Sequence, residues 1–86
     1  MDATTILTTE QLGDWIRRTR KASGLRQDQL AGVANVGHRF VVDLEKGKPT
    51  AQIGKVLQVL ATLGCTLTVT APAGLDLASQ PERRKP

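Results

Sequence analysis

Four residues that tolerate a left-handed backbone divide this 86-residue chain into short helical segments. They are Gly24, Asn35, Gly47 and Gly64, and each follows a stretch whose apolar side chains recur at the spacing of an amphipathic helix. Glycine and asparagine are the residues that most readily end a helix in this conformation. The chain is therefore predicted to fold as one small domain of short helices around a single core.

These helix-ending residues, together with capping residues, give approximate bounds for four helices. Thr8 and Gln11 match a capping box that opens the first helix, and Thr50 is expected to cap the last. The expected helices span residues 8–23, 27–34, 38–46 and 50–63. The side chains expected to point inward are Leu12, Trp15, Ile16, Thr19, Ala22, Leu30, Ala31, Ala34, Val41, Leu44, Ile53, Val56, Leu57, Leu60 and Leu63.

Basic side chains are concentrated in the middle of the chain. Between Trp15 and Lys55 there are nine Lys and Arg residues against three Asp and Glu residues, a net charge of +6, whereas the whole chain carries +4. A basic centre favours a polyanionic partner such as nucleic acid. Many soluble domains also carry a solvated basic face, so charge alone does not identify the partner.

Several function classes find no support in the sequence. His38 and Cys65, each the only residue of its type, belong to different elements and have no metal-ligand partner at a useful spacing. We find no glycine-rich phosphate loop, no paired carboxylates, no signal peptide and no apolar run long enough to span a bilayer. We therefore expect a cytoplasmic protein that is not an enzyme and requires neither a cofactor nor a metal.

The stretch LRQDQLAGVANVGHRFVVDLEKGKPT has a specific spacing. Gln27 opens a short helix, and the small side chain of Ala31 lets a second helix cross closely. Asn35 occupies the turn, and Val41 and Leu44 anchor the next helix. In this spacing the chain resembles the helix-turn-helix of the Cro and phage-repressor type, over roughly residues 12–63.

This resemblance implies a lambda-repressor-like, all-α domain of four to five short helices. Two positions depart from the family pattern. Arg26 stands where Thr or Ser usually caps the second helix, so that cap is weaker here. Asn35 replaces the usual turn glycine, which its tolerance of the left-handed conformation permits.

In a helix-turn-helix, the third helix enters the major groove and its outward N-terminal side chains meet base edges. Here these are His38, Arg39, Val42 and Asp43. Arg39 is the strongest candidate, because arginine forms two hydrogen bonds with guanine, and Val42 can contact a thymine methyl group. Asp43 either accepts a hydrogen bond from cytosine or orients Arg39 four residues earlier. His38 either contacts a base or donates to a phosphate.

Phosphate contacts are expected near the ends of the two central helices. Gln27 lies at a helix N-terminus, and Arg26, Lys46 and Lys48 are basic side chains nearby. Glu45 would repel phosphates. The resemblance implies instead that it forms a structural ion pair with Arg20 in the first helix.

The stretch CTLTVTAP, residues 65–72, alternates like a half-buried strand. Cys65, Leu67, Val69 and Ala71 fall on one face and three threonines on the other. Such a strand needs a partner, either the same strand of a second copy or residues 4–7 of its own chain. Because so small a module usually binds DNA selectively as a dimer, we expect the four residues to form a dimerisation strand.

The expected organisation is an N-terminal arm (1–7), a helix-turn-helix domain (8–64), the dimerisation strand (65–72) and a flexible tail (73–86). The run EKGKPTAQIGKVLQVLATLG, the strand and the tail together resemble the HipB-like antitoxins. This resemblance implies a bacterial, nucleoid-associated homodimer that represses transcription at a palindromic operator. It also implies a partner, a HipA-type serine/threonine kinase toxin. A stand-alone phage-type repressor and a protein-interaction adaptor that does not bind DNA are the alternatives.

Overall fold

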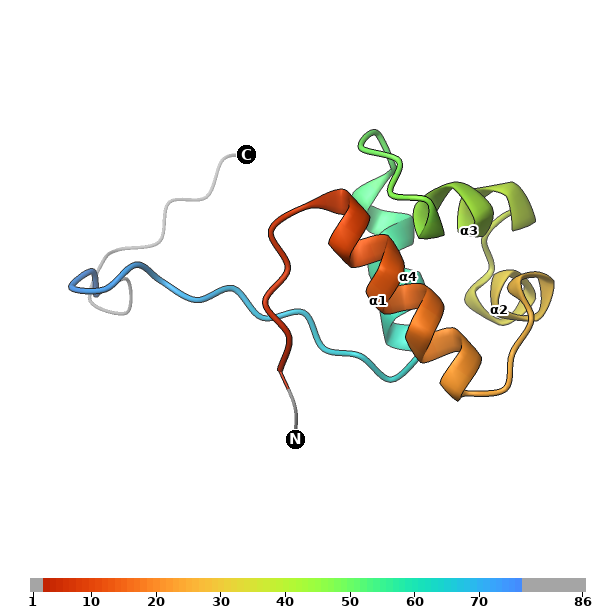
Figure 1. Ribbon diagram of the computed structural model, residues 1–86, viewed down its shortest axis with the longest axis horizontal. Coiled ribbons are helices and arrows are strands. Elements are labelled where there is room, and N and C mark those ends of the chain that lie inside the picture. The colour runs from red at the N-terminus through yellow and green to blue at the C-terminus, as the bar shows by residue number, and fades with distance from the viewer. Residues whose placement is uncertain (1–2, 77–86) are drawn as a thin grey trace, which may run out of the picture.

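The computed structural model describes residues 3–76, which form four helices joined by short turns (Figure 1). The helices are α1 (Thr9–Ala22), α2 (Gln27–Ala34), α3 (His38–Glu45) and α4 (Ile53–Thr62). This arrangement confirms the predicted all-α helix-turn-helix fold. No helix in this part of the chain is long and apolar enough to cross a membrane.

Local sequence signals explain where α1 begins and where α2 and α3 end. The Thr8 hydroxyl accepts a hydrogen bond from the Gln11 amide at 3.0 Å, and the Gln11 side chain accepts one from the Thr8 amide at 3.2 Å, which completes the predicted capping box. Asn35 ends α2 in the left-handed conformation, with φ 58° and ψ 45°. Gly47, with φ 87°, reverses the chain after α3.

The hydrophobic core lies between the four helices and consists almost entirely of aliphatic side chains. Ile16, Leu30, Val41 and Val59 are the largest fully buried ones. Ala31, Ala34, Leu44, Val56 and Leu60 complete the buried cluster. Leu12, Trp15, Phe40, Leu63 and Cys65 are partly buried against it. The expected inward faces of α2 and α3 are therefore confirmed.

The prediction for the fourth helix was partly wrong. Ile53 is 63% exposed and Leu57 is 43% exposed, whereas Val59, which was not expected inside, is fully buried. Six of the ten residues of α4 are apolar, so the helical pattern alone does not determine which face turns inward. Thr50, which was expected to cap this helix, instead forms a turn with Pro49. Gln52 is the N-cap residue, and it makes no side-chain capping bond.

One residue of the first helix also differs from its expected position. Ala22, the last residue of α1, was expected inward and is exposed. The chain turns at Ser23 and Gly24 and leads away to α2, so the helix end projects beyond the core. The other expected inward residues of α1 are buried or half-buried.

After α4 the chain continues as an extended segment beside the N-terminal arm (Figure 1). The Cys65 amide donates to the Leu60 carbonyl, but residues 66–71 make no backbone hydrogen bond within residues 3–76, and none joins them to the arm. Both segments line an open groove of about 920 Å³ with Trp15 of α1 and Leu60 of α4. Pairing of the predicted strand with a second copy stays a prediction. Residues 77–86 of the predicted tail lie outside the described residues.

Candidate nucleic-acid interface

The two faces of α3 differ sharply in character. Val41 and Leu44 point into the core. On the other side His38 and Arg39 are exposed, and Val42 and Asp43 are half-buried. Because residues four apart on a helix are neighbours, 38 with 42 and 39 with 43, the four side chains expected to contact bases share one surface. At the edge of this surface, Phe40 packs against the core, with the Lys55 ammonium 5.8 Å from the centre of its ring.

Two basic side chains on this surface share one carboxylate. Arg39 Nε lies 3.2 Å from Asp43 Oδ1, and Lys48 Nζ lies 3.8 Å from Asp43 Oδ2. The Lys48 backbone amide also donates to the Asp43 carbonyl at 3.1 Å, and the Gly47 amide donates to the Leu44 carbonyl at 3.0 Å. This pair of bonds is a Schellman motif, and it returns Lys48 to the side of α3 that carries Asp43.

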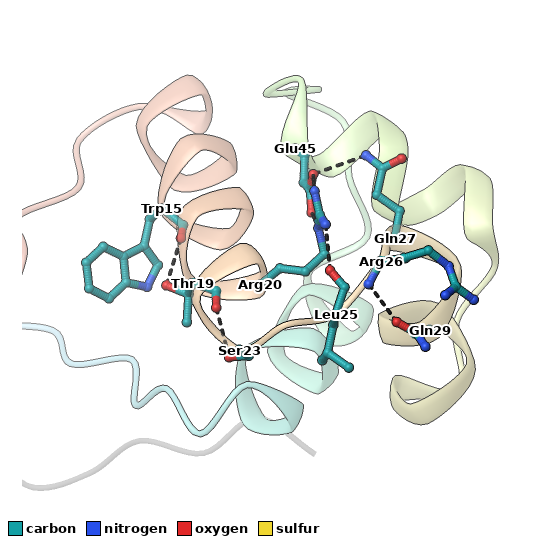
Figure 2. Close-up of polar contacts among 9 residues, drawn as sticks. All are labelled: Trp15, Thr19, Arg20, Ser23, Leu25, Arg26, Gln27, Gln29 and Glu45. Atoms are coloured by element: carbon teal, nitrogen blue, oxygen red, sulfur yellow. Dashed lines mark hydrogen bonds and ion pairs between the residues drawn. The ribbon is translucent and has the colours of Figure 1, made fainter.

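A second carboxylate, Glu45 at the end of α3, faces the interior (Figure 2). Arg20 Nε donates to Glu45 Oε2 at 2.6 Å and Arg20 Nη2 donates to Oε1 at 3.0 Å, so the ion pair expected between α1 and α3 is present in two-bond form. The Arg20 side chain is 8% exposed and that of Glu45 is 3% exposed. Arg20 Nη1 also donates to the Leu25 carbonyl at 2.8 Å, so the guanidinium holds the α1–α2 connection as well.

Gln27, the first residue of α2, is tied to the same carboxylate. Its Nε2 donates to Glu45 Oε1 at 3.1 Å (Figure 2). Gln27 was expected at a phosphate, and its bond to Glu45 was not foreseen from the sequence. Because Glu45 is the last residue of α3 and Gln27 the first of α2, the bond fixes one helix terminus against the other.

The C-terminal end of α3 sits directly on the backbone of α1. A Cβ added at Gly13 would overlap the carbonyl oxygens of Leu44 and Glu45. One added at Gly47 would come within 2.8 Å of Glu10 Cα. Only glycine fits at these two positions. This close contact fixes the position of the C-terminal end of α3 relative to α1.

The remaining basic side chains expected at phosphates are exposed. Arg26 precedes α2, and as a donor-only side chain it cannot cap the helix; the Gln29 side chain instead accepts from the Arg26 amide at 2.8 Å. Arg26 Nε lies 3.1 Å from Asp28 Oδ1, and this side-chain hydrogen bond lowers the pKa of Asp28 below its ordinary value. Lys46 follows α3 and is exposed. In residues 3–76 no three His, Cys, Asp or Glu side chains are grouped as a metal site would require.

Comparison with known proteins identifies the family. Residues 11–73 match the sequence profile of a family described as a helix-turn-helix domain. The chain belongs to the helix-turn-helix family. The chain is also 59% identical over 80 residues to an uncharacterized HTH-type transcriptional regulator, y4mF, of Sinorhizobium fredii strain NBRC 101917 / NGR234. That match covers 93% of this chain and 95% of the relative.

Solved structures of HipB share the fold of this regulator. HipB in a complex with the O4 20mer superposes with a TM-score of 0.74 at 17% identity, over 80% of this chain and 97% of that one. HipB in a HipA-HipB-O2-O3 complex gives the same values. At this level of identity the likeness establishes the fold alone.

Proposed function

We propose that this regulator is a sequence-specific transcriptional repressor that binds a palindromic operator as a homodimer and serves as the antitoxin of a HipA-type kinase. The observation that carries the DNA-binding part is the exposed surface of α3. This surface carries Arg39 and Lys48. On the opposite side, the buried ion pair of Arg20 and Glu45 fixes α3 to the rest of the domain.

In this proposal α3 lies in the major groove. Arg39 donates to guanine, Val42 contacts a thymine methyl group, and His38 at the start of the helix contacts a base or a phosphate. The basic side chains at the ends of α2 and α3 neutralise phosphates, and Gln27 donates to one from the N-terminus of α2. These phosphate contacts fix the register of α3, and the base contacts select the sequence.

Homodimer formation rests on apolar surface that residues 3–76 leave uncovered. Leu67 and Val69 of the extended segment are exposed, and Val69 is 88% exposed. Ile53 and Leu57 lie one turn apart on the outer face of α4 and are exposed as well. A second copy that paired its strand with residues 65–72 would satisfy the free backbone groups and cover Leu67, Val69 and Ala71, while Cys65 already packs against its own core.

The antitoxin part rests on resemblance. The chain resembles HipB-like antitoxins in sequence organisation, and HipB, which has the same fold, is described in a complex that contains HipA. The name of the Sinorhizobium relative mentions transcription alone, which suits the alternative of a stand-alone repressor.

Selection from a library of random duplexes, with the full-length protein, tests the DNA-binding part. We expect enrichment of a palindrome with two half-sites about one helical turn apart. Failure to enrich any duplex, from a protein that is folded and dimeric, would favour the protein-interaction adaptor and refute the proposal.

Two substitutions then separate base contacts from phosphate contacts. Arg39→Ala should weaken binding to the selected duplex by about 5- to 150-fold and leave binding to a scrambled duplex much less affected. Lys48→Ala should weaken both and flatten the plot of log affinity against log salt by about one unit. Equal losses on both duplexes from Arg39→Ala would exclude its role in selecting a base.

Affinity capture from the native organism tests the antitoxin part separately. We expect a serine/threonine kinase to be recovered in stoichiometric amount, and its activity to be suppressed in the complex. Recovery of operator DNA without a kinase would establish the stand-alone repressor instead.

A further inference from the structure

We infer that Asp43 determines the DNA specificity of this regulator by holding Arg39 and Lys48, and not by accepting a hydrogen bond from cytosine. The inference rests on the proposed DNA-binding function and goes beyond it. It assigns a positioning role to an acid on a surface that otherwise attracts phosphates.

The geometry around Asp43 supplies the first argument. Each carboxylate oxygen faces a different cation, Arg39 at 3.2 Å and Lys48 at 3.8 Å. The Asp43 side chain is only 24% exposed, while both cations are largely exposed. Because each oxygen already faces a cation and the side chain is mostly buried, a cytosine amine would have to reach the lone pairs that Arg39 and Lys48 leave.

The position of the ion pair on the arginine supplies the second argument. Asp43 approaches the guanidinium at Nε, the atom nearest the aliphatic stem. Contact at Nε leaves the terminal Nη1 and Nη2 of this largely exposed side chain as donors, and a pair of parallel donors is what guanine O6 and N7 accept. Asp43 thus presents the arginine in the orientation that discriminates guanine.

The shared carboxylate also restrains binding to random DNA. Affinity for any duplex comes mainly from cations that neutralise phosphates and release counterions. Arg39 and Lys48 must give up part of their interaction with Asp43 before either can neutralise a phosphate. Arg39 can keep its pair with Asp43 while its terminal nitrogens donate to guanine, whereas a random duplex offers no guanine at that place. Asp43 therefore lowers non-specific affinity more than specific affinity.

The decisive variant is Asp43→Asn, which keeps the shape and removes the charge. We expect its affinity for a scrambled duplex to rise and the salt dependence of that affinity to steepen by about 0.9 units, because one more cation is available to phosphates. The ratio of affinities for the selected and scrambled duplexes should fall by about tenfold or more. Fluorescence anisotropy titrations over a series of salt concentrations measure both quantities.

Asp14→Asn is a matched control. Asp14 pairs with Arg18 at 3.0 Å, four residues apart on one helix, but on α1. Asp14→Asn removes the same charge from the same kind of pair, so it should raise the affinities for the selected and the scrambled duplex slightly and equally. The double variant Arg39→Ala, Asp43→Asn should show no further loss of discrimination beyond that of Arg39→Ala alone, because the release of Lys48 strengthens binding to both duplexes alike and discrimination depends on the arginine. A thermal melt of each variant confirms that it is folded.

The outcomes are distinct. If the wild-type protein selects no duplex, the proposed function fails and the role of Asp43 fails with it. If the wild-type protein selects an operator and Asp43→Asn behaves like Asp14→Asn, only the role of Asp43 is refuted. A repeated selection with Asp43→Asn should lose the guanine preference that Arg39→Ala also loses. Loss of preference at a separate cytosine instead would establish direct contact and overturn the inference.

Discussion

The buried ion pair between Arg20 and Glu45 gives the sharpest stability prediction. Replacing Arg20 by Met keeps most of the volume but leaves a carboxylate that is 3% exposed without its counter-charge. Breaking one side of a buried pair typically costs about 3–5 kcal/mol of unfolding free energy. The Leu25 carbonyl loses its donor as well, which adds about 1 kcal/mol.

This cost is large against the whole stability of such a domain, about 5–15 kcal/mol. A loss of 3 kcal/mol lowers the melting temperature of a domain of this size by about 12 °C or more. Urea unfolding followed by the fluorescence of Trp15, the sole tryptophan, measures the free energy directly. The helical circular dichroism signal should follow the same transition, which tests for two-state behaviour.

Two further variants make the test specific. Arg18→Met breaks the exposed pair with Asp14 and should cost less than about 1 kcal/mol. The double variant Arg20→Met, Glu45→Leu removes both buried charges and should be more stable than Arg20→Met alone, because no unpaired ion remains. If Arg20→Met costs no more than Arg18→Met, or if the double variant is less stable than Arg20→Met, an unpaired buried carboxylate is not the cause of the stability loss.

Three other substitutions test separate parts of the molecule. Val69→Pro should abolish dimerisation and weaken operator binding, because proline breaks a paired strand. Analytical ultracentrifugation measures the loss of the dimer, and thermal melting should show that the stability of the monomer is unchanged. Ala73→Pro is the control, since it lies in the turn closed by the Leu75 amide and the Pro72 carbonyl. Gly13→Ala should destabilise the fold by about 1–3 kcal/mol, since its Cβ overlaps backbone carbonyls. In an NMR titration the pKa of Asp28 should lie below 3.8 and rise towards it in Arg26→Ala.

The sign of the Asp28 effect on stability follows from the direction of its shift. Its pKa is lowered in the folded protein, so the pair with Arg26 contributes stability above the ordinary carboxyl pKa. That contribution is lost as the pH falls through the lower, folded-state pKa. Both side chains are largely exposed, so the effect on the melting temperature should be small. The assignment would be contradicted if the melting temperature of the wild type fell as the pH rose from 3 to 5 and that of Asp28→Asn fell by a smaller amount.

Most of the helical framework was predictable because its signals are local. The bounds of α2 match the prediction at both ends, and Asn35 takes the left-handed conformation expected of it. Each of these features depends on the preferences of a few adjacent residues. The fourth helix was less predictable, because Ile53 and Leu57 are as apolar as the buried Val56 and Val59. The choice between the two faces depends on the position of the other helices, which α4 alone does not encode.

The candidate site was predictable as a set of residues but not as a network. The pair of Arg20 and Glu45 came from the family resemblance, since the two are separated by 25 residues and share no periodic pattern. The bond from Gln27 to Glu45 and the approach of Lys48 to Asp43 were not foreseen. Both depend on how helix ends meet in space, and the second requires the left-handed turn at Gly47.

The two carboxylates of α3 show why stability and specificity should separate in this protein. Asp43 and Glu45 are two residues apart, about 200° around the helix, so they face opposite sides. Glu45 is buried and paired with Arg20, and it sets where α3 is held on the domain. Asp43 faces outward between two exposed cations, and it sets what those cations do before DNA arrives. Substitutions around Glu45 should therefore lower the unfolding free energy without changing which base is preferred. Substitutions at Asp43 should change the preference of a protein that melts almost as the wild type does.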